Sequence, residues 1–138
     1  MKRHTTKSIV VLMSLLIILG SGTTALAAQP SAIEPMYIGL LRADPLVTIS
    51  SGTVFCKDLV TIKTGYSANI TWTLQGGSGR EFKPIATWTS SGGTRHPLDA
   101  SRIADKGSSY RLKTSIKVYN SSGTLVDDEV KYSSVVTY

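Results

Sequence analysis

The chain of 138 residues carries 15 Lys and Arg against 9 Asp and Glu, and it contains a single cysteine. Three of the cations (Lys2, Arg3 and Lys7) precede an apolar run, so 15 minus 3 leaves 12 against 9, a net charge of +3 for the rest of the chain. Proteins that bind nucleic acid concentrate a much larger basic excess on one element, so we expect no nucleic-acid partner.

The first 27 residues have the features of a signal peptide. Their positive start is followed by a short apolar run at 9–19 and by small residues at Ala25 and Ala27, the positions that signal peptidase reads. A membrane-spanning helix needs roughly 20 apolar residues, which is about twice the length of this run. We therefore expect cleavage after Ala27, secretion of residues 28–138 to the extracellular medium, and no stable membrane insertion afterwards.

The secreted part has the length of one domain of common size. Its first segment, 28–45, contains Pro30 and Pro35 and begins with too little apolar content to fold alone, which predicts an N-terminal extension or tether. We expect the domain itself to occupy residues 46–138.

Two segments alternate strictly between apolar and polar residues, as strands with one face toward water do. They are SANITWTLQ (67–75) and YRLKTSIKVY (110–119). Between them, FKPIATWTSS (82–91) predicts an extended segment whose Pro84 favours an edge position or a bulge. The stretch 91–109 shows no alternation, so we expect a surface connection there, with room for one helical turn at 100–104.

The turn NSSG (120–123) predicts the register of the hairpin that follows. A loop of three residues with Gly123 in the left-handed region would place Asn120 opposite Thr124. The next pairs in this register are Val118 with Val126 and Lys117 with Asp127.

The same register creates a conflict farther along the hairpin. It would set Asp128 opposite the inward Ile116, and burying that charge costs several kcal/mol. We therefore expect a bulge near 127–128 that returns Val130 and Tyr132 to the inner face.

Several short strands with turn signals and few amphipathic patterns predict an all-β fold, a single antiparallel β-sandwich of about seven strands. The arrangement resembles an immunoglobulin-like domain. Cys56 lies where the cysteine of the second strand would be, Trp72 where the core tryptophan of the third would be, and ADKGSSYRL resembles the turn and tyrosine before the penultimate strand. In that pattern a second cysteine would stand at Leu112, so the resemblance implies that Cys56 packs unpaired, as a small apolar side chain.

A narrower resemblance rests on the signal sequence, the early cysteine and the segments WTLQGGSG, KPIATWTSSG, YRLKTSIKVYNSSG and YSSVVTY. Together these are similar to a group of small secreted proteins from Gram-positive bacteria that has no assigned activity. The resemblance implies an extracellular all-β domain and no particular chemistry.

Catalytic candidates are few. A Cys56 nucleophile would need an exposed, electropositive setting and a base, and His96 is the one histidine beyond the signal peptide. We expect Cys56 to be a buried structural thiol, with an intermolecular disulfide as the alternative if it is exposed. We expect His96, beside Pro97 in a polar stretch, to be solvated.

No motif for a metal site or a nucleophile elbow occurs in the sequence, so we expect no enzyme, no cofactor and no metal. The acidic run Asp127 to Glu129 could be proposed as a calcium site. Adjacent strand residues face opposite sides, however, so charges that protect an edge strand from association are the preferred interpretation.

The most notable constellation is a possible ligand-binding face formed by Arg111, Lys113, Lys117 and Tyr119. Their alternate spacing places three cations and an aromatic ring on one outer face, which could hold an anionic cell-wall polymer or an acidic protein partner. The preferred interpretation of these residues taken alone is a solvated face that Asp127 and Glu129 of the neighbouring strand partly neutralise.

The sequence therefore predicts a secreted, monomeric, non-catalytic binding module that acts at the cell surface or in the medium. The alternative is a secreted antagonistic effector, a toxin or bacteriocin-like protein that acts on competitor cell envelopes. Basic charge and export allow that alternative, although no membrane-active amphipathic helix supports it.

Overall fold

A computed structural model describes residues 36–138, and the signal peptide and the cleavage after Ala27 predicted above lie outside these residues. Within them the chain forms strands and no helix, which confirms the all-β prediction. The strands are β1 (Leu40–Arg42), β2 (Leu46–Ser50), β3 (Thr53–Ile62), β4 (Ser67–Gly77), β5 (Lys83–Gly92), β6 (Arg95–Ile103), β7 (Ser109–Tyr119), β8 (Leu125–Tyr132) and β9 (Val136–Thr137). Nine strands stand where about seven were expected, because β1 and β9 are short additions of 3 and 2 residues.

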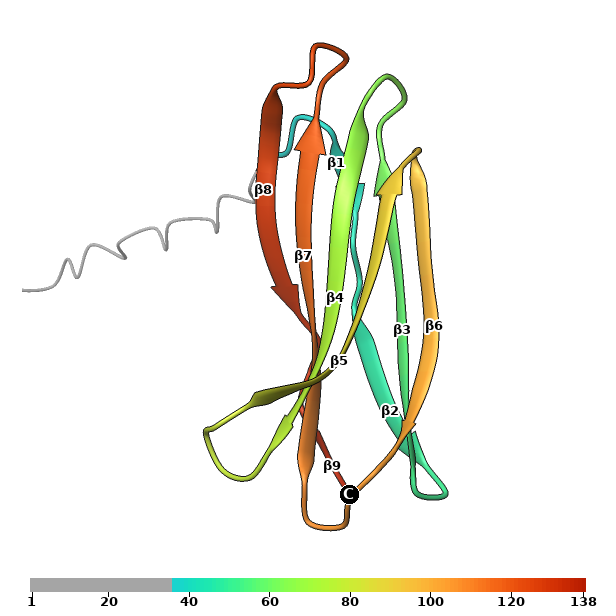
Figure 1. Ribbon diagram of the computed structural model, residues 1–138, viewed down its shortest axis with the longest axis vertical. Coiled ribbons are helices and arrows are strands. Elements are labelled where there is room, and N and C mark those ends of the chain that lie inside the picture. The colour runs from blue at the N-terminus through green and yellow to red at the C-terminus, as the bar shows by residue number, and fades with distance from the viewer. Residues whose placement is uncertain (1–35) are drawn as a thin grey trace, which may run out of the picture. The chain divides into compact units, whose positions relative to one another are not determined.

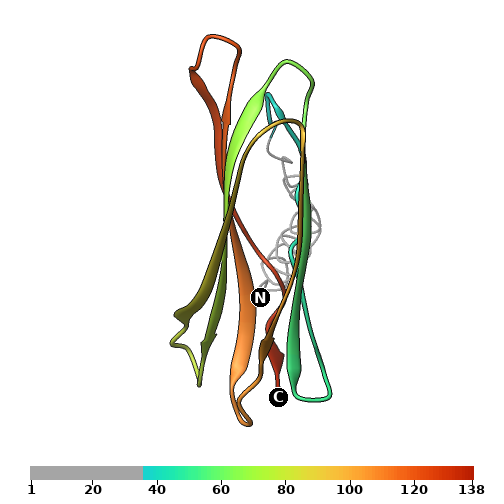
Figure 2. The same ribbon diagram turned by 45° about the vertical axis from the view of Figure 1, so that its right-hand side comes forward.

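The strands form two antiparallel sheets that pack face to face as a β-sandwich (Figures 1 and 2). In the first sheet, β3 pairs with β1 and β2 along one side and with β6 along the other. The second sheet has the order β5-β4-β7-β8, and β9 pairs with β7. The turn between β5 and β6 carries the chain from the second sheet to the first, as the arch at the top of Figure 2 shows.

The core follows from alternation along three long strands. Every second residue of β3, β4 and β7 is buried, because successive side chains of a strand point to opposite faces. Trp72 of β4 is 1% exposed, and Leu112 of β7 and Cys56 of β3 are fully buried. Cys56 is a free thiol, so the prediction of a buried, unpaired cysteine is confirmed.

Residues 95–103 form strand β6, so the prediction of a surface connection with a helical turn is wrong. This strand pairs with β3 along its whole length, and it turns His96, Leu98 and Ala100 inward while Pro97 and Asp99 face out. Pro97 is tolerated because β6 lies at the edge of its sheet, where a missing N–H leaves no partner strand unpaired. Because the inward residue His96 is polar and the outward residue Pro97 is apolar, the sequence of β6 does not alternate as a half-buried strand is expected to do.

The β7–β8 hairpin begins as predicted. Gly123 has a φ of 78°, and the Asn120 amide donates to the Thr124 carbonyl at 2.9 Å. The bulge, however, comes earlier than expected: Tyr119 pairs with Leu125 and Val118 pairs with Asp127. The extra residue is Val126, so the predicted pairing of Val118 with Val126 is wrong.

The early bulge reverses the faces of β8. Lys117 lies opposite Asp128 instead of Asp127, and Val130 and Tyr132 point outward, 44% and 50% exposed, instead of inward. The inner positions of β8 hold Asp127, Glu129 and Lys131. This register is stable because Asp127 finds three backbone donors on the segment that leads into β1.

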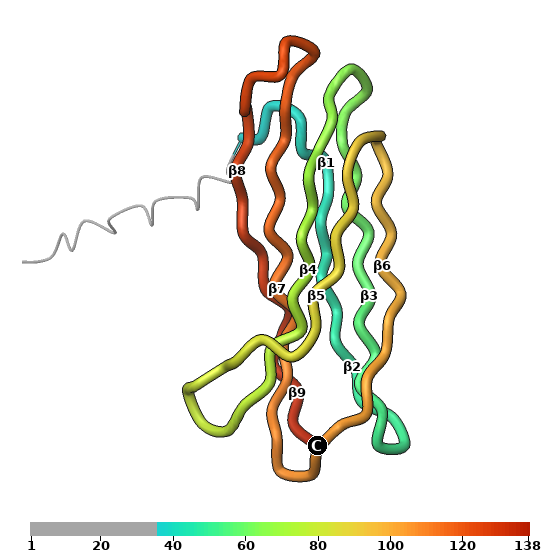
Figure 3. The backbone as a smooth tube through the Cα atoms, viewed as in Figure 1, coloured from blue at the N-terminus to red at the C-terminus, as the bar shows by residue number. Residues whose placement is uncertain are grey.

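Residues 38–45 belong to the sandwich, although the sequence suggested a tether as far as residue 45. Leu40 and Ala43 are buried in the core, and β1 pairs with the end of β3. The carboxylate of Asp127 accepts hydrogen bonds from the amides of Ile38, Gly39 and Leu40 at 2.9, 2.7 and 2.9 Å. Figure 3 shows the chain passing beside β8 before it enters β1.

Candidate ligand-binding face

The candidate residues lie on the outer face of the β5-β4-β7-β8 sheet. Arg111, Lys113, Lys117 and Tyr119 occupy the outward positions of β7, whose inward positions are all buried in the core. The structure therefore brings the predicted set together on one face. Lys117 is exposed, and the other three side chains are half-buried.

Two aromatic rings lie against the side chain of Arg111. Its guanidinium lies 4.3 Å from the ring centre of Phe82, which precedes β5, and 4.5 Å from that of Tyr132 at the end of β8. The Nε–H group donates to Oε1 of Gln75, its cross-strand neighbour on β4, at 2.8 Å. Elements from three parts of the chain thus fix the position of one cation, by cation–π contact and one hydrogen bond.

The terminal amino groups of Arg111 differ from Nε. Within residues 36–138 the structure gives them no hydrogen-bond acceptor, so two forked donors are open at the end of a fixed side chain. Sequence reasoning placed Arg111 on the face but missed Phe82 and Tyr132, since no short-range pattern links residues so far apart along the chain.

The face is poorly neutralised. Lys117 pairs with Asp128 of β8 at 3.6 Å, a solvent-exposed ion pair of the kind that contributes about 1 kcal/mol or less. Asp128 is the one acidic residue at the outward positions of these four strands. The expectation that Asp127 and Glu129 would neutralise the face is wrong, because both point to the inner side of β8. Lys113 has no acidic partner within 4 Å among the described residues.

Hydroxyl groups cover the part of the face next to the cations. Thr71 and Thr73 of β4 pair with Thr89 and Thr87 of β5, and Thr71 also pairs with Ser115 of β7. These residues share the outward side with Lys113. The outer face therefore combines a row of cations on β7 with a group of hydroxyls on the strands beside it.

Cys56 and His96 are too far apart to act as a nucleophile and base. They lie on adjacent strands, but Cys56 pairs with Ala100 while His96 pairs with Val60. Burial raises the pKa of the Cys56 thiol to about 11, although the charge of Arg102 acts in the opposite direction. The thiol is therefore protonated at neutral pH and shielded from solvent.

His96 is buried at 2% exposure, so the prediction of a solvated loop residue is wrong. Its Nδ1 lies 2.8 Å from the hydroxyl of Ser90 on β5, and its Nε2 lies 3.3 Å from the Gly93 carbonyl. These contacts tie the β5–β6 turn to both sheets, and they leave neither ring nitrogen facing solvent.

The two inward carboxylates of the acidic run on β8, Asp127 and Glu129, have hydrogen-bond partners within the protein. Glu129 accepts a hydrogen bond from the Tyr37 hydroxyl at 3.0 Å, and Asp127 holds the three amides described above. No group of three or more potential metal ligands occurs within residues 36–138. Both inward carboxylates anchor the N-terminal segment of the sandwich.

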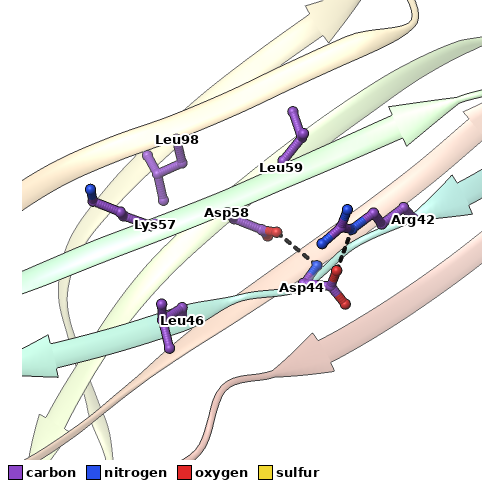
Figure 4. A pocket seen from close by; sticks show the side chains of 7 residues that line it. All are labelled: Arg42, Asp44, Leu46, Lys57, Asp58, Leu59 and Leu98. Carbon is purple, nitrogen blue, oxygen red and sulfur yellow. Dashed lines mark hydrogen bonds and ion pairs between the residues drawn. The ribbon is translucent and has the colours of Figure 1, made fainter.

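A hollow of about 270 Å³ lies beside β2 and β3 (Figure 4). It is lined by Arg42, Asp44, Leu46, Lys57, Asp58, Leu59 and Leu98. Its one buried carboxylate, Asp58, accepts hydrogen bonds from the Asp44 amide (2.9 Å), the Trp72 indole (2.9 Å) and the Thr114 hydroxyl (2.7 Å). Asp58 thus links the two sheets, and the charged side chains that line the hollow already have partners within the protein.

Comparison of the chain with protein-family models and with curated proteins gave no match. Among the described residues there is no helix of the length and apolar character needed to cross a membrane. The geometry of the outer face is therefore the observation from which a function can be argued.

Proposed function

We propose that the protein is a secreted, non-catalytic, immunoglobulin-like binding module that holds an anionic polymer of the cell surface. The ligand lies on the outer face of the β5-β4-β7-β8 sheet. The observation that carries this proposal is the charge of that face, where three cations meet a single acidic residue and one cation, Arg111, lies against two aromatic rings. Uncompensated charge on one face attracts a polyanion over several ångströms and raises its rate of association.

Several features support the individual parts of the proposal. The signal-peptide pattern of residues 1–27 supports secretion, and the order of β2, β3 and β6 against β5, β4, β7 and β8 supports the immunoglobulin-like arrangement. Within residues 36–138, the separation of Cys56 from His96 and the burial of both side chains support a binding role. The modest net charge beyond the signal peptide favours a ligand that binds to one charged face over a nucleic acid, which usually requires a larger basic excess.

Retention on washed bacterial cell walls tests the proposal. The test variant replaces the cations of the face: Arg111→Gln, Lys113→Gln and Lys117→Gln. The control variant replaces the same number and kinds of cation on the opposite sheet and its turns: Lys57→Gln, Lys63→Gln and Arg95→Gln. The controls match because Lys57, like Lys117, has one exposed partner, Asp99 at 3.9 Å.

The expected result is saturable retention of the wild type, at least tenfold weaker retention of the test variant, and retention of the control close to wild type. Added salt should release the wild type, because exposed charges are screened within about 8 Å at physiological ionic strength. Equal loss in both variants would show that net charge, and not this face, causes retention. No retention of the wild type would reject a wall-binding role.

A further inference from the structure

We infer that Arg111 determines the specificity of this face and that its forked amino groups take a phosphodiester of a polyol phosphate chain. The inference rests on the proposed function, because it names the class of polymer that the same face holds. It depends on three features of the described residues. They are the contacts of Phe82, Tyr132 and Gln75 with Arg111, which we call the clamp, the spacing of the cations on β7, and the hydroxyls of β4 and β5.

The contacts of Arg111 leave its two terminal amino groups without a partner among the described residues. The rings of Phe82 and Tyr132 lie 4.3 and 4.5 Å from the guanidinium carbon, and Gln75 accepts the hydrogen bond from Nε. The terminal amino groups can therefore form two parallel N–H···O bonds to an oxyanion with two free oxygens. Because the rings hold the fork before the ligand arrives, little rotamer entropy is lost on binding.

The cations are separated by one and then two intervals of two residues along β7. Lys113 lies two residues beyond Arg111 on β7, a Cα separation of about 6.8 Å at the usual strand rise, and Lys117 follows at about twice that interval. Successive phosphates of an extended glycerol phosphate chain are separated by a comparable distance. One chain running along β7 can therefore place a phosphate at Arg111 and the next at Lys113.

The surroundings of these cations suit a polyol between the phosphates. Thr73 and Gln75 of β4 lie directly beside Lys113 and Arg111, and Thr87 of β5 lies beside Thr73. Their polar groups can exchange hydrogen bonds with the hydroxyls of a polyol. A polymer of carboxylates can accept hydrogen bonds from these groups but offers no hydroxyl donors to their oxygens, which is the basis for expecting discrimination.

A single-stranded nucleic acid also carries phosphodiesters, but it requires a second feature. Such strands bind by stacking bases on aromatic faces as well as by charge. On this surface one face each of Phe82 and Tyr132 is already covered by Arg111. The observations therefore favour the polyol phosphate.

The experiment measures binding of soluble polymers to the purified protein by titration calorimetry at physiological salt. The probes are poly(glycerol phosphate), poly-glutamate and single-stranded oligodeoxythymidine, matched in number of charges. We expect poly(glycerol phosphate) to bind at least tenfold more tightly than either of the others. Equal binding of poly-glutamate would overturn the class of ligand, and tighter binding of the oligonucleotide would replace it with nucleic acid.

Charge-preserving variants test the clamp. Arg111→Lys keeps the charge and loses the fork, and Phe82→Leu keeps the charge and removes one side of the clamp. We expect about tenfold weaker binding of poly(glycerol phosphate) for the first and about threefold for the second. Tyr138→Leu, which removes an exposed ring elsewhere, is the control and should bind as the wild type does. Unchanged affinity in Arg111→Lys would overturn the role of the fork.

The Arg111 Nε–H signal in a nitrogen-resolved NMR spectrum gives a readout that is independent of affinity. It should shift on addition of poly(glycerol phosphate) in both the wild type and Tyr138→Leu, and a signal that stays in place would contradict direct contact. Wall retention without binding of poly(glycerol phosphate) would reject this inference and leave the proposed function standing. Binding of poly(glycerol phosphate) without wall retention would reject the wall-binding function and leave the assignment of the phosphodiester to Arg111 standing.

Discussion

Replacement of Asp127 by Asn should detach the segment that leads into β1. The carboxylate is 8% exposed and accepts hydrogen bonds from three successive amides, those of Ile38, Gly39 and Leu40. An Asn side chain can keep two of these bonds in a weaker, neutral form through its one oxygen. When that oxygen keeps the bonds from Gly39 and Leu40, the amino group of Asn faces the N–H of Ile38, so that two donors oppose each other.

The size of the effect follows from these bonds. A hydrogen bond to a charged group contributes about 1.5–3 kcal/mol and a neutral one about 1 kcal/mol, so the loss of one bond and the weakening of two should lower the free energy of unfolding by about 3 kcal/mol. The loss cannot exceed the free energy that holds residues 38–42 in place, since detachment of that segment would hydrate its amides.

The control is the next residue of the same strand. Asp128 points outward and forms an exposed ion pair with Lys117, so Asp128→Asn should lower the free energy of unfolding by about 0.5 kcal/mol or less. Urea unfolding at pH 7, followed by the fluorescence of Trp72 and Trp88, compares both variants with the wild type. Amide hydrogen exchange should become faster at residues 38–40 in Asp127→Asn alone. Equal unfolding midpoints for the two variants would refute the reasoning.

The pH dependence supplies a second check. Burial opposes ionisation of Asp127, but the bonds from Ile38, Gly39 and Leu40 outweigh it, so the pKa of this carboxyl lies below its ordinary value. A carboxylate with a lowered pKa in the folded state adds stability above its unfolded pKa of about 3.9, and this stability is lost as the pH falls through the folded value. The difference between wild type and Asp127→Asn should be constant above about pH 5 and should narrow below about pH 4. A difference that stays constant down to pH 2 would contradict the assigned role.

Three further changes test the core. Cys56 should not react with a thiol reagent such as DTNB until the protein is unfolded in urea, and Cys56→Ser should lower the free energy of unfolding by about 2 kcal/mol because a hydroxyl replaces a buried thiol; rapid reaction in the native state would refute its burial. Asp58→Ala should lower the free energy of unfolding by about 4 kcal/mol, because three donors lose their acceptor; a loss below 1 kcal/mol in urea unfolding would show that Asp58 does not link the sheets. Gly39→Ala should lower the melting temperature and reduce the free energy of unfolding by about 2 kcal/mol, because its Cβ would lie 2.7 Å from Val118 and 2.9 Å from Tyr66. An unchanged melting temperature would show that the neighbouring side chains move aside without loss of stability.

The alternation along β4 and β7 was enough to predict their strands and the side of each residue. A residue of a half-buried strand has its environment set mainly by its parity, so the hydrophobic pattern by itself placed Trp72, Leu112 and the cations of β7. The sides of these residues depend on neighbours close along the chain. The buried thiol at Cys56 was implied instead by the resemblance to an immunoglobulin-like domain.

The faces of β6 and β8 were decided by the tertiary structure. Both strands turn a polar residue inward, His96 in one and Asp127 in the other, and a hydrophobic pattern assigns such residues to the outside. Each is buried because it finds hydrogen-bond partners, which for Asp127 lie 87 to 89 residues away along the chain. No local pattern can supply such partners, so the bulge was predicted in the wrong place.

The candidate face was likewise determined in part by the sequence and in part by the tertiary structure. Its cations share one side because β-strands alternate, which the sequence alone determined. The clamp around Arg111 exists because β5 and β8 are brought to the two flanks of β4 and β7, so that Phe82 and Tyr132 meet a residue of another strand. Only the pairing of the strands could decide this contact, since it joins three segments that are separate along the chain.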